Sequence, residues 1–104
     1  MRITQHKTNG VFLEFNNGLE LSTKWAYCDY CENYDKGTED KSGFGVQRDG
    51  SHDVEFMFVG GDEKLIKKLC KKFGSDDNPS GYIKLEDWLK MLAHISRIQD
   101  KEIK

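Results

Sequence analysis

The spacing of hydrophobic residues changes at Asp62, and this change constrains the fold more than any other feature of the chain. Before Asp62, apolar residues alternate with polar ones, which is typical of a strand with one buried face. After it, apolar residues recur every three or four positions, which is typical of an amphipathic helix. The order predicts an α+β domain, in which an antiparallel sheet of three to four strands packs against two C-terminal helices.

The first two strands are predicted to form an N-terminal β-hairpin around the tripeptide NNG, residues 16–18. A two-residue turn would pair Phe15 with Glu20 and set an apolar face against a polar one. A three-residue loop pairs Phe15 with Leu19, so that both apolar faces coincide. We therefore expect a type I turn that a left-handed glycine closes.

Two more strands are expected before Asp62. The segment DVEFMFV, residues 53–59, is apolar on both faces, which indicates a central strand. Residues 44–46 form a shorter candidate strand, and the polar stretch 32–43 is predicted to be a long exposed loop. Residues 1–61 are thus the β-rich part of a single domain.

Residues 62–98 are predicted to be a helix-loop-helix, followed by a frayed tail at residues 99–104. The first helix has Asp62 as its N-cap and Gly74 as its stop. Its expected buried stripe is Leu65, Ile66, Leu69, Cys70 and Phe73. The expected stripe of the second helix is Leu85, Trp88, Leu89, Leu92 and Ile95.

The length of 104 residues suits one domain with one modest core. The net charge of −2 is the balance of −4 in residues 1–61 and +2 in residues 62–104, so the two parts differ in surface sign. No segment has the apolar length of a signal peptide or a membrane span. We therefore expect a soluble cytoplasmic protein without membrane contact. If a phage encodes the protein, we expect it in the cytoplasm of the host.

The stretch KWAYCDYCENYDKG, residues 24–37, is the leading candidate site. Its tyrosines lie among acidic residues and cannot all be buried, and tyrosine is enriched at protein interfaces. Stacking on single-stranded nucleic acid needs basic residues between the rings, and here the neighbours are acidic. A protein partner is therefore predicted, with contact residues Trp25, Tyr27, Tyr30, Cys31, Asn33 and Tyr34. The sequence is also compatible with a homodimer formed through an exposed strand edge.

Cys28 and Cys31 raise the alternative of a zinc site or a redox pair. Structural zinc needs four ligands, and the remaining candidates, Cys70 and three histidines, are scattered along the chain. A redox pair needs a lowered thiol pKa, which the acidic neighbours oppose. Free thiols and no cofactor are the expectation.

A second metal alternative is an EF-hand-like calcium loop at residues 76–87, DDNPSGYIKLED. Gly81 stands at the position of the sharp turn, but Lys84 replaces a ligand and the last ligand is an aspartate rather than a glutamate. The calcium ligands would be Asp76, Asn78, Ser80, the carbonyl of Tyr82, and Asp87. The competing interpretation is a turn into the last helix, in which Ile83 packs against the core.

Two other function classes are less favoured. The lysines of the first helix, Lys64, Lys67, Lys68, Lys71 and Lys72, are typical of a solvated face, although they allow weak, salt-dependent nucleic-acid binding. No nucleophile with a base and no phosphate-binding loop is found, so an enzyme is not expected.

Four segments, NNGLELSTKW, YCEN, HDVEFMFV and GYIKLEDWLKML, resemble a widespread group of short uncharacterised proteins from bacteriophages and prophages. The similarity extends over roughly residues 10–95. The matching positions are Gly18, Ser22, Trp25, Tyr30, Cys31, Asn33, Glu55, Gly81 and Tyr82. Cys28 lies outside the shared pattern, and the segment AYCDYC and the lysine-rich helix depart from it.

The resemblance implies a host-directed or defence-countering binding protein. The leading functional hypothesis is therefore a small phage-type accessory protein that binds stoichiometrically to a host or defence protein. A metal-binding module is the first alternative, and weak nucleic-acid binding is the second.

Overall fold

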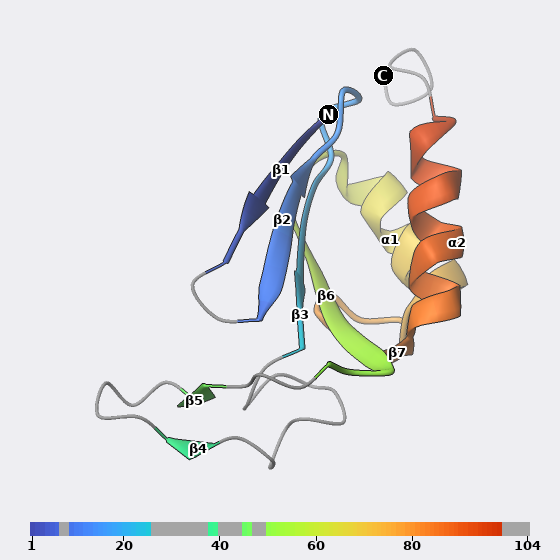
Figure 1. Ribbon diagram of the computed structural model, residues 1–104. Coiled ribbons are helices and arrows are strands. Elements are labelled where there is room, and N and C mark those ends of the chain that lie inside the picture. Colours follow the sequence, from blue (N-terminus) through green and yellow to red (C-terminus); the bar gives the residue numbers. More distant parts are fainter. Residues whose placement is uncertain (7–8, 26–37, 40–44, 47–49, 99–104) are drawn as a thin grey trace.

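The computed structural model describes residues 1–6, 9–25, 38–39, 45–46 and 50–98 (Figure 1). Its main element is a five-stranded antiparallel sheet in the order β1-β2-β3-β6-β7. The strands are β1 (Arg2–Gln5), β2 (Gly10–Glu14), β3 (Glu20–Lys24), β6 (Asp53–Gly60) and β7 (Ser80–Lys84). Two helices, α1 (Glu63–Phe73) and α2 (Leu85–Ser96), pack against one face of this sheet. The α+β expectation is thus confirmed, with more strands than the three to four predicted.

The predicted hairpin is confirmed in its register. Leu13 lies opposite Leu21, and the Phe15 amide donates to the Leu19 carbonyl at 2.9 Å. Gly18 has a φ of +90°, so the three-residue loop closes with glycine in the left-handed region. The side chain of Asn17 leaves this loop and donates to the carbonyl of Ile95 at 3.2 Å, which ties the turn to the end of α2.

Both extra strands are at the edges of the sheet, and both were missed. β1 has no buried residue, so its alternation carries little hydrophobic signal. β7 corrects the predicted helix-loop-helix to helix-strand-helix. The side chain of Asn78 holds the start of β7 to β6, because it accepts from the Phe58 amide at 2.8 Å and donates to the Phe58 carbonyl at 2.9 Å. Ile83 packs into the core, as its alternative interpretation predicted.

A separate two-stranded sheet joins β4 (Thr38–Glu39) to β5 (Gly45–Val46). β5 coincides with the short strand predicted at residues 44–46. β4 lies inside the stretch 32–43, so the prediction of a continuous loop there is wrong at these two residues. The rest of that stretch lies outside the described residues, as does the predicted tail at 99–104.

The boundaries of α1 agree with the sequence. The carboxylate of Asp62 accepts from the Leu65 amide at 2.9 Å and caps the helix. Gly74 ends it with an extended backbone, and a Cβ at this position would lie 2.8 Å from the ring of Phe56. Glycine is therefore required here by close packing rather than by its conformational freedom.

The buried stripe of α2 is shifted from the predicted one. Leu89 is 58% exposed, while Met91 is completely buried. Residues 88, 91, 92 and 95 follow the three- and four-residue spacing of a single helix face, and Leu89 lies outside it. The indole of Trp88 donates to the hydroxyl of Thr23 at 3.0 Å, which fixes α2 to β3.

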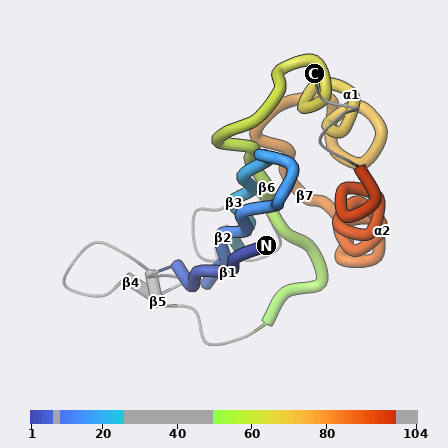
Figure 2. The backbone as a smooth tube through the Cα atoms, turned by 90° about the horizontal axis from the view of Figure 1, so that it is seen from above, coloured from blue at the N-terminus to red at the C-terminus, as the bar shows by residue number. Residues whose placement is uncertain are grey.

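The helices do not cover the whole sheet. Seen from above, α1 and α2 lie beside β6 and β7, and β1 lies at the far edge (Figure 2). The core is correspondingly centred on β3, β6 and the inner side of β2. The opposite face of β6 is open, with Met57 and Val59 42% and 48% exposed. The prediction of β6 as a central strand is confirmed, although only one of its faces is buried.

Candidate functional site

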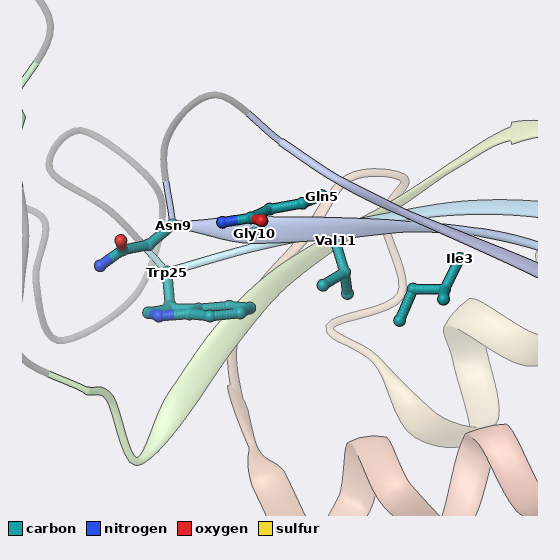
Figure 3. Close-up of a pocket in the computed structure, with 6 residues that line it drawn as sticks. All are labelled: Ile3, Gln5, Asn9, Gly10, Val11 and Trp25. Carbon is teal, nitrogen blue, oxygen red and sulfur yellow. The ribbon is translucent and has the colours of Figure 1, made fainter.

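An open hollow lies on the β1–β2 side of the sheet, away from β6 and β7. It has a volume of about 460 Å³ and is lined by residues of β1, of β2 and of the segments beside them (Figure 3). The lining residues are Ile3, Gln5, Asn9, Gly10, Val11 and Trp25. Of the predicted contact residues, only Trp25 lies within the described part of the chain, and it lines this hollow.

Strand register explains how the hollow forms. Val11 lies opposite both Gln5 and Thr23, and the amide of Trp25 donates to the Asn9 carbonyl at 3.1 Å, which extends the β2–β3 ladder by one pair. Since side chains at alternate positions share a face, Val11 and Trp25 lie on the same face as the core. Figure 3 shows both projecting to the side on which the helices lie.

Burial falls steeply along this face. Leu13 is 4% exposed beneath the helices, whereas Val11, two residues earlier, is half-buried. Trp25 is also half-buried and packs against the edge of the core. The hollow is therefore the continuation of the core surface beyond the helices, and its apolar floor is accessible.

The side chains of the hollow have no formal charge. Ile3, Val11 and Trp25 supply apolar surface, and Gln5 and Asn9 supply neutral amides that both donate and accept hydrogen bonds. None of these lining side chains is an acid, a base or a thiol. This chemistry suits an apolar side chain with neighbouring peptide groups, because buried polar groups need hydrogen-bond partners.

The remaining predicted contact residues, Tyr27, Tyr30, Cys31, Asn33 and Tyr34, lie outside the described residues, as does Cys28. Conversely, the hollow contains five residues that the sequence pattern did not indicate: Ile3, Gln5, Asn9, Gly10 and Val11. The sequence signal for β1 was that the apolar Ile3 stands between the polar residues Arg2 and Thr4. A strand of four residues is too short for this alternation to be recognised.

Two of the predicted calcium ligands, Asn78 and Ser80, have other hydrogen-bond partners. Asn78 bonds the backbone of Phe58 through both atoms of its amide. Ser80 is completely buried, and its hydroxyl accepts from the Ser75 amide at 3.1 Å and donates to the carbonyl of Asp77. Within the described ranges, no cluster of three or more His, Cys, Asp or Glu side chains has the arrangement of a metal site. Residues 76–87 thus contain strand β7 and the start of α2. These contacts give no support to the calcium interpretation.

The other predicted groups lie where the helix pattern placed them. The five lysines of α1 are exposed. Cys70 is a buried free thiol, 2% exposed, and burial raises its pKa, with Asp76 and Asp77 adding to the shift and a hydrogen bond with Ser80 opposing it. Such a thiol is poorly disposed to ligate metal or to react, because both require the thiolate.

Among the helices of the described structure, none has the length and apolar character to cross a membrane.

Comparison with known proteins identifies no relative of the chain. No family model matches the chain, and no curated protein or solved structure is significantly similar to it.

Proposed function

We propose that the protein is a small, non-enzymatic accessory protein of the bacteriophage type, which binds stoichiometrically to a host or defence protein in the bacterial cytoplasm. One observation carries the proposal: Trp25 lines an open, uncharged hollow on a part of the sheet that the helices leave uncovered. Aromatic residues in such positions dominate many protein interfaces, since they bury a large area with few rotatable bonds.

The position of Trp25 supports the contact segment that the sequence suggested. Trp25 directly precedes residues 26–37, which contain the acidic tyrosine cluster. A partner seated on the hollow would therefore contact Trp25, the residue that immediately precedes this segment in the sequence. The resemblance of this stretch to short phage proteins supports the same class of function.

The test begins with capture of a partner from bacterial host lysate by the tagged full chain, followed by purification of that partner. Calorimetric titration is expected to give a fixed stoichiometry. Trp25→Ala is expected to weaken binding by at least about thirtyfold, the effect of losing a hot-spot aromatic residue. The double variant Tyr30→Ala/Tyr34→Ala is expected to abolish capture.

Leu89→Ala is the matched control, because Leu89 is an exposed apolar residue of α2 and does not line the hollow. Circular dichroism of each variant establishes that the fold is intact. Full binding by both aromatic variants would contradict the assigned surface. Turnover of the partner by substoichiometric amounts of the protein would contradict the non-enzymatic role.

A further inference from the structure

In the part of the chain that the structure describes, no strand pairs with the outer edge of β1. The His6 amide donates to the Gly10 carbonyl at 3.0 Å, and in an antiparallel ladder bonded pairs alternate with non-bonded pairs. The register then gives bonded pairs at Thr4–Phe12 and Arg2–Glu14. The amide and carbonyl groups of Ile3 and Gln5 consequently point away from β2, and no described strand pairs with them.

The two edges of the sheet differ in regularity. At the other edge, the register between β6 and β7 shifts, and Tyr82 within β7 has a φ of +55°. Such irregularity protects an edge from pairing with another chain. β1 has a continuous register over all its residues, with no proline and no bulge. Of the two edges of this five-stranded sheet, the β1 edge therefore has the regular register that a further strand requires.

An apolar row on the helix side of the sheet runs to this edge. Phe58, Leu21, Leu13 and Ile3 lie opposite one another on β6, β3, β2 and β1. The first three are at most 4% exposed, whereas Ile3 is 64% exposed. The row therefore ends at an aliphatic side chain, Ile3, that is exposed to solvent. If a second copy pairs with this edge, its own row extends the apolar surface beyond Ile3.

The charges at the edge permit such self-association. Arg2 is the one charged residue of β1, and it lies 3.6 Å from the carboxylate of Glu14 on the neighbouring strand. Ile3, Thr4 and Gln5 are neutral. Charged side chains on an edge strand discourage pairing with another chain. Two β1 edges can therefore meet without placing like charges opposite each other.

We propose that the protein forms a symmetric homodimer by antiparallel pairing of β1 with β1 of a second copy. Ile3 of one copy lies opposite Ile3 of the other, because register follows the match of apolar faces. The two sheets become one continuous sheet, and the apolar row crosses the twofold axis. The hollow, which Ile3 lines on its β1 side, is then bordered there by the second copy.

Sedimentation equilibrium of the full chain tests the proposal. The wild type is expected to reach twice the monomer mass of 12.0 kDa as its concentration rises. Ile3→Lys is expected to raise the dimer dissociation constant by about a hundredfold, because two isoleucine side chains lose their burial and two ammonium groups meet at the axis. Leu89→Lys is the matched control, since Leu89 is similarly exposed on α2 and the dimer should persist.

Amide hydrogen exchange of the wild type identifies the surface without a substitution. The amides of Ile3 and Gln5 are expected to become protected as the dimer forms, whereas the amide of Thr4, which faces β2, is already protected in the monomer. A wild type that remains monomeric at every concentration overturns the proposal. So does a dimer that leaves Ile3 and Gln5 unprotected, or one that survives Ile3→Lys. A foreign strand that protects these amides while the protein stays monomeric would replace the second copy as the occupant.

Discussion

The thiol of Cys70 illustrates how burial controls a single titratable group. Because the folded protein holds this thiol in its core, its pKa is raised above the ordinary value, and burial is the main cause. An unfolded chain loses the same proton near pH 8.5. The unfolded state thus binds fewer protons than the folded state above that pH. The stabilisation is complete below the unfolded pKa and is lost as pH rises toward the folded pKa.

This difference predicts that the free energy of unfolding falls more steeply above about pH 8.5 in the wild type than in Cys70→Ala, by up to about 1.4 kcal/mol per pH unit. Urea titrations between pH 7 and pH 10 under reducing conditions measure it. Cys28 and Cys31 are present in both proteins, so the difference between the two curves isolates Cys70. Parallel curves would show that the thiol ionises equally in both states.

At the scale of elements, local patterns were sufficient for the hairpin and for α1. The hairpin register follows from the alternation around residues 16–18, and α1 from its apolar spacing and its Asp62 cap. β7 was not predictable in this way, because the contacts that hold it are long-range. Asn78 bonds Phe58, twenty residues away in sequence, and β7 pairs with β6 although the whole of α1 lies between the two strands in the chain.

The attachment of α2 to the sheet depends on another long-range contact. Trp88 donates its indole N–H to the hydroxyl of Thr23, which is completely buried. Trp88→Phe is predicted to lower the free energy of unfolding by about 1–3 kcal/mol, because a buried hydroxyl loses its partner and some apolar area is also lost. Chemical denaturation of the full chain measures the loss.

A double-mutant cycle with Thr23→Val separates the hydrogen bond from the packing. Valine has the shape of threonine without its hydroxyl, so removing both partners leaves no unsatisfied group. The double variant is therefore expected to lose less stability than the sum of the two single variants. Strict additivity would mean that the two groups do not interact in the folded state.

At the scale of the whole molecule, the sequence indicated the layers but not where they end. The alternation and the helical stripes predicted helices on a sheet, as observed. The hollow was not predicted, because it depends on how far α1 and α2 extend over the strands. Ile3 and Val11 are aliphatic like core residues, and only the placement of the helices leaves them accessible.

The one-sided covering of the sheet makes a prediction about two adjacent residues of β6. Phe56 is completely buried beneath the helices, and its ring packs edge-on against that of Phe58, with 5.8 Å between the ring centroids. Met57, in contrast, is 42% exposed on the open face. Phe56→Ala is expected to cost about 3–5 kcal/mol of stability, through lost burial and the cavity left behind. Met57→Ala is expected to cost less than about 1 kcal/mol, since the methionine already contacts water. Denaturant titration of both variants measures the contrast. Equal losses would mean that the open face is covered in solution, which would require a second layer over Met57 and Val59.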